Sequence, residues 1–221
     1  MNKKIIISII ALTMLCLSVF VFAAPNKTID NFSLSKGWNL VYGFNDPSQI
    51  IDEGSNSEGN SESISADEIR NSVEVIYVYN PDVDEYVLLY AKEGTKQTGE
   101  YTNINPPQNI AGEIPTSVMW VYSERTYSMK YDAPEYPLLS NRDIIKGWNF
   151  VPVSPEMKDK SINELTGNCV FESIYTYAEE DGITQWINLG SVLDDKRMLS
   201  EASASGLQLV IKVKDDCRMS T

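Results

Sequence analysis

The sequence predicts an all-β protein of two small antiparallel β sandwiches or partly open barrels in tandem, each with one short helix. Three observations predict this fold. The segment 34–41 (LSKGWNLV) returns as 144–151 (IIKGWNFV), and an internal repeat indicates two copies of one supersecondary unit. Both copies contain runs of β-branched and aromatic residues, which are typical of strands. Each copy also contains one Ser-x-x-Glu capping box, a local signal for a short helix.

Residues 1–23 have the layout of a secretory signal peptide. Lys3 and Lys4 precede an apolar run over residues 5–22, and two alanines follow it. We expect cleavage after Ala23. The alternative is an uncleaved membrane anchor, because about 18 apolar-dominated residues approach the length that spans a bilayer.

The charge of the mature chain is strongly negative. Without Lys3 and Lys4, 16 basic residues stand against 31 acidic ones, which gives a net charge of about −15. This charge repels nucleic acid and anionic membranes, so we expect neither as a partner after signal cleavage. It suits a secreted or cell-surface protein. The mature length of about 198 residues is enough for one large or two small domains.

The first repeat is expected over residues 31–132. Ser, Asn, Glu and Gly dominate its segment 52–63, and this composition predicts a disordered acidic surface loop. The capping box at Ser65 then predicts a short helix. The strands expected after it are residues 73–79, a returning hairpin strand that carries Tyr86, and the closing strand 118–122.

A Pro-containing linker is expected over residues 133–141, and the second repeat over 142–217. The second repeat is more compact, and its capping box lies at Ser161. Its expected strands are residues 170–177, a returning strand that carries Trp186, and the closing strand 208–212.

Two cysteines remain after signal cleavage, Cys169 and Cys217. An even number of cysteines in an exported chain predicts a disulfide. Because this disulfide would close a loop of about 48 residues, the chain-entropy model gives it a stabilisation of about 4 kcal/mol. Two buried free thiols are the alternative.

The order of these features resembles the Gly-Trp-Asn-Leu-Val-type tandem repeat domains of exported and cell-surface proteins of bacteria and archaea. Eight residues of the second repeat carry the resemblance: Gly147, Trp148, Asn149, Cys169, Tyr175, Tyr177, Asp216 and Cys217. The first repeat departs from the pattern because it lacks both cysteines, and Asn71 and Tyr127 stand near the equivalent positions. The family has no known activity, so the resemblance implies a location and an architecture only.

The chain contains no histidine. This excludes Ser-His-Asp and Cys-His catalysis and every imidazole metal site, and bridged cysteines are not nucleophiles. We therefore expect no enzyme activity. The alternative is a carboxylate-dependent enzyme that acts on polysaccharide, because two-carboxylate hydrolysis needs only Asp and Glu.

The turn after the first hairpin strand places oxygen ligands at every second position, at Asn80, Asp82 and Asp84, as the start of a calcium loop does. However, Glu85 stands where that loop requires glycine, and Ala91 stands where it requires an acid. A polar hairpin turn explains the same residues. A calcium-stabilised surface module is therefore a second alternative function.

The aromatic residues divide into two expected groups. Trp38 and Trp148 recur at equivalent places and are predicted to be core residues. The residues expected to be exposed as a ligand face are Tyr79, Tyr86, Tyr177 and Trp186. We therefore expect an exported, non-enzymatic surface or secreted module for structure, adhesion, or recognition of a protein or glycan, without a cofactor.

Overall fold

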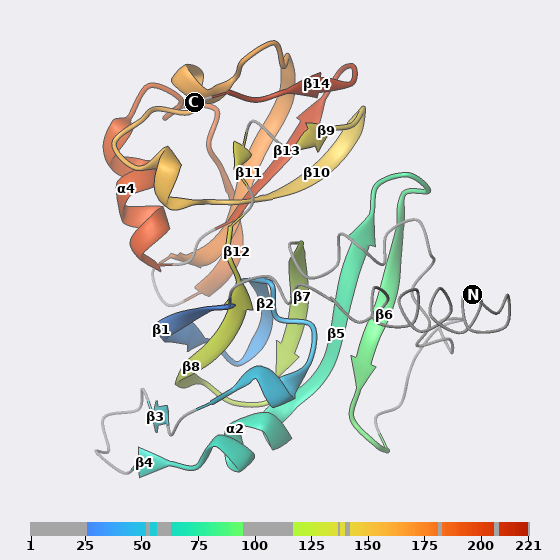
Figure 1. Ribbon diagram of the computed structural model, residues 1–221, viewed down its shortest axis with the longest axis vertical. Coiled ribbons are helices and arrows are strands. Elements are labelled where there is room, and N and C mark those ends of the chain that lie inside the picture. The colour runs from blue at the N-terminus through green and yellow to red at the C-terminus, as the bar shows by residue number, and fades with distance from the viewer. Residues whose placement is uncertain are drawn as a thin grey trace, which may run out of the picture.

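The computed structural model describes residues 26–51, 54–56, 63–94, 117–136, 138–139, 142–180, 183–205 and 208–220 (Figure 1). It confirms the all-β class, because its strands form antiparallel sheets and its described α-helices are two. The predicted signal peptide, residues 1–23, lies outside the described residues. No described helix is both long enough and apolar enough to cross a membrane.

The N-terminal half, drawn in blue to yellow-green in Figure 1, contains two four-stranded sheets. The strands of the first sheet, in spatial order, are β2 (Gly37–Tyr42), β7 (Val118–Ser123), β5 (Val73–Asn80) and β6 (Glu85–Ala91). Those of the second are β1 (Asn26–Leu34), β8 (Tyr127–Pro134), β3 (Gly54–Asn56) and β4 (Ser63–Ile64). The 3₁₀-helix η1 (Pro47–Gln49) and helix α2 (Ala66–Ser72) lie in the connections.

The C-terminal half, in yellow to red, has one four-stranded and one two-stranded sheet. The strands of the larger sheet, in spatial order, are β10 (Gly147–Pro152), β13 (Gln208–Val213), β11 (Phe171–Glu180) and β12 (Ile183–Asn188). The smaller sheet pairs β9 (Asp143–Ile144) with β14 (Cys217–Arg218). The remaining elements are η4 (Pro155–Met157), η5 (Asn163–Leu165) and helix α4 (Lys196–Ser205).

The two large sheets, β2-β7-β5-β6 and β10-β13-β11-β12, share their strand order and register. Trp38 lies opposite Tyr122, and Trp148 lies opposite Lys212 at the same place in the other half. Strands β5 and β11 each contain a register shift at their first residues. The β1–β8 pair corresponds in the same way to the β9–β14 pair.

Each half has its own core between its layers. In the N-terminal half, Val41, Ile76 and Val121 of the large sheet pack with Met129 and Tyr131 of the second sheet. In the C-terminal half, the core contains residues from both sheets and from α4, among them Ile144, Val151, Ile174, Leu199 and Ile211. Full burial of such a side chain stabilises the fold by about 1.5–3 kcal/mol.

A third apolar cluster joins the outer faces of the two large sheets. Leu40 and Val118 of the N-terminal half are buried against Val210 of the C-terminal half. The aromatic residues that surround them are Trp120, Trp148, Phe150 and Tyr177. We call this cluster the seam. Because of it, the two halves pack against each other through their large sheets.

The repeated Gly-Trp-Asn triplet forms the turn that precedes β2 and β10. Gly37 and Gly147 have φ angles of 101° and 100°, a region that favours glycine. The Asn39 amide donates to the carbonyl oxygens of Ser35 and Gly37 at 2.8 and 3.0 Å, and its Oδ1 accepts from the Ser35 N–H at 2.9 Å. Asn149 repeats this pattern in the C-terminal half. The Gly and the Asn of the triplet therefore have a structural role.

The prediction that Trp38 and Trp148 are core residues is wrong. Successive side chains of a strand point to opposite faces, so residues three apart do not share a face. Because Val41 points into the core, Trp38 lies on the outer face and is 38% exposed. Trp148 lies at the seam for the same reason.

An α-helix follows only the first of the two predicted capping boxes. Ser65 caps α2, and its Oγ accepts from the Glu68 N–H at 3.2 Å. Ser161 and Glu164 also form a capping box, but only the three-residue η5 follows it. Helix α4 was not expected from the sequence, although its residues include many strong helix formers (KRMLSEASAS).

The predicted boundaries shift because β1 and β8 pair with each other. Strand β1 begins at Asn26, before the expected start of the first repeat, and β8 extends to Pro134, inside the expected linker. Within the segment 52–63, predicted to be disordered, residues 54–56 and 63 lie in short strands, and Ser55 pairs with Ser128 of β8. Residues 52–53 and 57–62 lie outside the described residues.

Candidate functional site

A groove of about 490 Å³ opens along the seam between the two halves. Its volume lies within the range of about 300–1,000 Å³ that is usual for small-molecule sites. Eight residues line it: Tyr79, Asp84, Tyr86, Trp148, Phe150, Tyr175, Trp186 and Val210. Six of them are aromatic, and among them Asp84 alone carries a formal charge.

Strands of both halves build the groove. Tyr79 of β5 and Tyr86 of β6 lie opposite each other in the first hairpin and form the N-terminal wall. Trp148 and Phe150 are two residues apart in β10 and therefore point to the same face of their sheet. With Tyr175 of β11, they belong to the C-terminal wall. The groove depends on both halves.

Contacts between aromatic rings hold the two walls of the groove in place. The Tyr79 ring centroid lies 5.3 Å from that of Tyr86 and 5.3 Å from that of Phe150 in the other half. On the C-terminal wall, Tyr175 lies 6.2 Å from Trp148 and 6.3 Å from Trp186. Aromatic pairs at such distances contribute about 0.5–1.5 kcal/mol each beyond the burial of their area. The rings are therefore positioned before any ligand binds.

The predicted ligand face comes together in the structure, but it is not identical to the groove. Tyr86 is 39% and Trp186 48% exposed, whereas Tyr79 and Tyr177 are half-buried. Tyr177 does not line the groove; its ring packs on Trp186 at 5.2 Å and on Trp120 at 4.9 Å.

Sequence reasoning missed three residues of the C-terminal wall as ligand contacts. The sequence predicts Trp148 as a core residue, Phe150 appears only within the repeated segment 144–151, and Tyr175 appears only in the expected strand 170–177 and in the family resemblance. The alternation of side chains along a strand predicts which residues share a face of the sheet. It does not predict which of the two faces packs on the core. The sequence signal that could have indicated a ligand face is the recurrence of aromatic residues on both faces of these strands.

Asp84 lies at the end of the hairpin turn with a φ angle of 55°. The Tyr79 hydroxyl donates to Asp84 Oδ1 at 2.5 Å. Burial raises the pKa of Tyr79 well above its usual value, and the bond to Asp84 adds to this shift. The phenol therefore stays protonated and remains a donor to the carboxylate.

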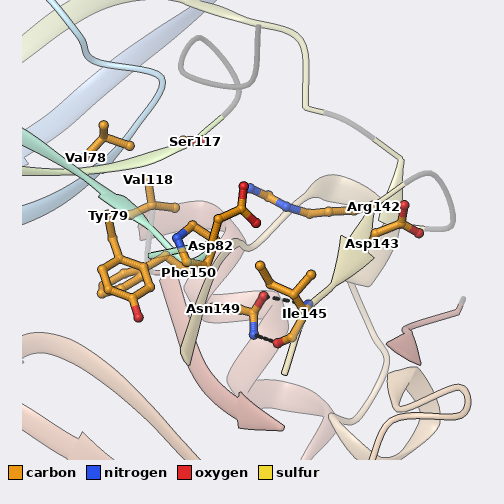
Figure 2. A pocket seen from close by; sticks show the side chains of 11 residues that line it. Val78, Tyr79, Asp82, Ser117, Val118, Arg142, Asp143, Ile145, Asn149 and Phe150 are labelled. Atoms are coloured by element: carbon orange, nitrogen blue, oxygen red, sulfur yellow. Dashed lines mark hydrogen bonds between the residues drawn. The ribbon is translucent and has the colours of Figure 1, made fainter. Parts of the chain in front are cut away.

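The three predicted calcium ligands have different surroundings in the turn. Asn80 is buried, and its Oδ1 accepts from the Asp82 N–H at 3.1 Å, as in a polar turn. Asp84 accepts from Tyr79. The Asp82 carboxylate points toward the guanidinium of Arg142 (Figure 2). Over the described residues, no group of three or more His, Cys, Asp or Glu side chains is arranged to hold a metal ion.

A second, smaller cavity of about 260 Å³ lies at the seam and is also lined by Tyr79 and Phe150. Its polar lining includes Asp82 and Arg142, whose charged groups point toward each other (Figure 2). Asn149 reaches it as well, but the bonds from its amide go to the turn backbone at Ile145 and Gly147. This side of the seam is therefore polar, whereas the larger groove is aromatic.

Among the described residues, Glu164 and Asp195 are carboxylates with clearly shifted pKa values, and neither lines the groove. The Lys196 ammonium, 2.6 Å away, donates a hydrogen bond that lowers the pKa of Glu164 to about 2. Hydrogen bonds from Arg197 lower the pKa of Asp195. A general acid of a glycosidase needs the opposite shift, a raised pKa.

The two cysteines lie at disulfide distance, with Sγ atoms 2.19 Å and Cα atoms 5.1 Å apart. Cys217 pairs with Ile144 in β14–β9, and Tyr127 pairs with Leu34 in β8–β1. Tyr127 therefore stands at the place of Cys217 and is buried there. The N-terminal half therefore has a buried tyrosine, Tyr127, at the position where the C-terminal half has Cys217, one of its two paired cysteines.

Comparisons with protein-family models, with curated proteins and with solved structures find no match. The resemblance to Gly-Trp-Asn-Leu-Val-type repeats stays a prediction.

Proposed function

We propose that this protein is a non-enzymatic recognition module that acts outside the cytoplasm and binds a glycan in the aromatic groove between its halves. The observation that carries the proposal is the set of six aromatic rings along one groove. The apolar C–H face of a sugar ring packs well on an aromatic ring, whose face is weakly negative. The rings of Tyr86 and Trp186 are accessible for such stacking.

The polar groups of the groove suit a sugar ligand as well. Asp84 is an acceptor, and the hydroxyl of Tyr86 is both a donor and an acceptor. Burial raises the pKa of Tyr86, so this hydroxyl stays protonated. A mostly aromatic lining with a few polar groups is the usual composition of a binding site for a small ligand.

The location outside the cytoplasm rests on three features. The N-terminal sequence predicts a signal peptide. Cysteines at disulfide distance are usual for oxidising compartments. The resemblance to exported repeat domains implies the same location. Adhesion or a structural role at the cell surface is compatible with a glycan-binding groove.

The polysaccharide-hydrolysing alternative has less support. Two-carboxylate hydrolysis needs a pair of carboxyl groups at the scissile bond. The described lining residues of the groove include one carboxylate, that of Asp84, and its Oδ1 is engaged by Tyr79. This composition favours binding over hydrolysis.

The test is a glycan-binding screen with the chain that begins at Ala24, followed by calorimetry with the best ligand. Trp186→Ala removes a ring from the groove and is expected to weaken binding about 5- to 150-fold, if a sugar ring stacks on the indole as strongly as a nucleic-acid base does, at about 1–3 kcal/mol. Ile183→Ala is the matched control, because Ile183 is an exposed apolar residue of the same strand that does not line the groove. Equal losses in both variants, or no glycan bound at all, would contradict the proposal.

A further inference from the structure

The charge of the groove is one-sided. Its lining residues include a carboxylate at Asp84, and no Lys or Arg is among the described residues that line it. Each of its six aromatic rings also presents a weakly negative face. A cation over such rings is attracted by about 0.5–2 kcal/mol, more when it is desolvated. The groove therefore attracts positive charge and disfavours negative charge.

Asp84 is poised to receive a cation. The Tyr79 hydroxyl engages its Oδ1, whereas its Oδ2 has no hydrogen-bond partner among the described residues. No lysine or arginine of the described chain forms an ion pair with Asp84. A carboxylate with a vacant oxygen beside aromatic rings accepts a charge-assisted hydrogen bond from an ammonium group.

The C-terminal wall already lies close to an ammonium group. The Nζ of Lys212 lies 6.0 Å from the centroid of the Trp148 ring and is paired with Glu172 at 3.1 Å. Lys212 does not line the groove. An ammonium group next to a carboxylate thus already lies against one ring of this wall, that of Trp148, outside the groove.

The charge of the whole chain acts in the same direction. The sequence carries a net charge of −13 and has an isoelectric point of about 4.4. Such a field concentrates cationic ligands near the surface and repels anionic ones. Glycans rich in carboxylate or sulfate groups are therefore poor candidates for the groove.

We infer that the ligand is a glycan with free amino groups, in which an amino-sugar ring stacks on the aromatic wall and its ammonium binds Asp84. This inference rests on the proposed function and names the chemical class of its glycan. A lysine side chain has the same charge, but it offers no flat ring face for the aromatic wall, so the groove favours the sugar.

The test compares two hexasaccharides with the same sugar backbone, the hexamer of glucosamine and the hexamer of N-acetylglucosamine. The first has free amines and the second has neutral acetamides in their place. Calorimetry is run at about pH 6, where the amines are protonated. We expect the glucosamine hexamer to bind at least about tenfold more tightly, in line with a hydrogen bond to a charged group. Its affinity is also expected to fall as salt is raised from about 50 to about 500 mM.

Asp84→Asn is the decisive variant, because asparagine tolerates the positive φ of this position and keeps an oxygen for the Tyr79 hydroxyl. It is expected to lose about tenfold in affinity for the glucosamine hexamer and clearly less for the acetylated one, which carries no ammonium group for the carboxylate to bind. Val83→Ala is the matched control in the same turn, because Val83 is exposed and does not line the groove. It is expected to bind like the unchanged chain.

The outcomes separate the inference from the proposed function. If both hexamers bind equally and Asp84→Asn changes nothing while Trp186→Ala abolishes binding, the amino-sugar inference is wrong and the glycan-binding groove stands. If hexalysine binds with the same dependence on Asp84 and the sugars do not, the ligand is a protein and both are wrong. If no probe and no screened glycan binds, the proposed function itself fails.

Discussion

The Trp120 ring of the N-terminal half lies 4.9 Å, centroid to centroid, from the Tyr177 ring of the C-terminal half. Trp120 also contacts Trp186 of the C-terminal half at 5.6 Å and Trp38 of its own half at 6.1 Å. One indole thus connects strand β7 with strands β11 and β12. This contact is part of the seam that packs the two large sheets against each other beside the groove.

Trp120→Ala is expected to destabilise the protein by about 3 kcal/mol, because it removes a large aromatic side chain from the seam. It also removes coupling between the halves, so we expect two unfolding transitions in the variant and one in the parent chain. Urea unfolding measures the loss of stability, and scanning calorimetry shows whether the protein unfolds in one transition or two. The control is Trp38→Ala, since the rings that Trp38 contacts among the described residues, those of Tyr77, Trp120 and Tyr122, belong to its own half. A single transition with an unchanged midpoint in Trp120→Ala would contradict this account of the seam.

Cys217→Ala is expected to cost about 4 kcal/mol of stability, the value for a cross-link that closes a loop of this length. The loss belongs to the C-terminal half, where both cysteines lie. Urea unfolding with and without a reductant checks the prediction, and reduced parent protein is expected to match the variant. If reduction leaves the midpoint unchanged, the cysteines do not stabilise the fold as a disulfide.

Asn149→Ala is expected to cost about 1–3 kcal/mol, because it leaves the backbone groups of the β10 turn without their amide partner. Asn188→Ala is the control: Asn188 is exposed, and its side chain accepts one bond, from the Gly190 N–H. Thermal unfolding of the two variants gives the comparison. Equal, small losses would show that the triplet asparagine does not hold the turn.

The Glu164–Lys196 pair predicts a dependence of stability on pH. The folded pKa of Glu164, about 2, lies below the usual glutamate value of 4.5. A lowered pKa contributes stability that is present above the unfolded pKa and is lost as the pH falls through the folded pKa. The unchanged chain is therefore expected to melt above Glu164→Gln at pH 7, and this difference should shrink between about pH 4.5 and 2. The effect is small because the pair is exposed. If the difference in melting temperature between the two proteins grew as the pH fell, the pKa of Glu164 would be raised in the folded state and not lowered.

The local parts of the fold were predictable from the sequence. The hairpin strands follow from runs such as 73–79, and α2 follows from the Ser65 capping box. Proximity of Cys169 to Cys217 followed from their number in an exported chain. These signals are local or compositional, so no knowledge of packing was needed.

The seam was not predictable, because it depends on which face of each sheet meets the other half. In β7, Met119 faces the core and Trp120 faces the seam, and both residues are apolar. Alternation separates the two faces but does not identify the one that meets the other half. For this reason Trp38 and Trp148 were assigned to the core. Pairing of β1 with β8, about a hundred residues apart, is likewise a tertiary property.

The most direct test of the aromatic groove is a titration of the ¹⁵N-labelled chain with the tightest glycan, followed through the indole N–H signals of its four tryptophans. We predict that the signals of Trp148 and Trp186, which line the groove, shift most, and that the signal of Trp38, which does not, shifts least. Saturable binding that moves Trp38 and leaves Trp148 and Trp186 in place would locate the ligand elsewhere and contradict the central claim.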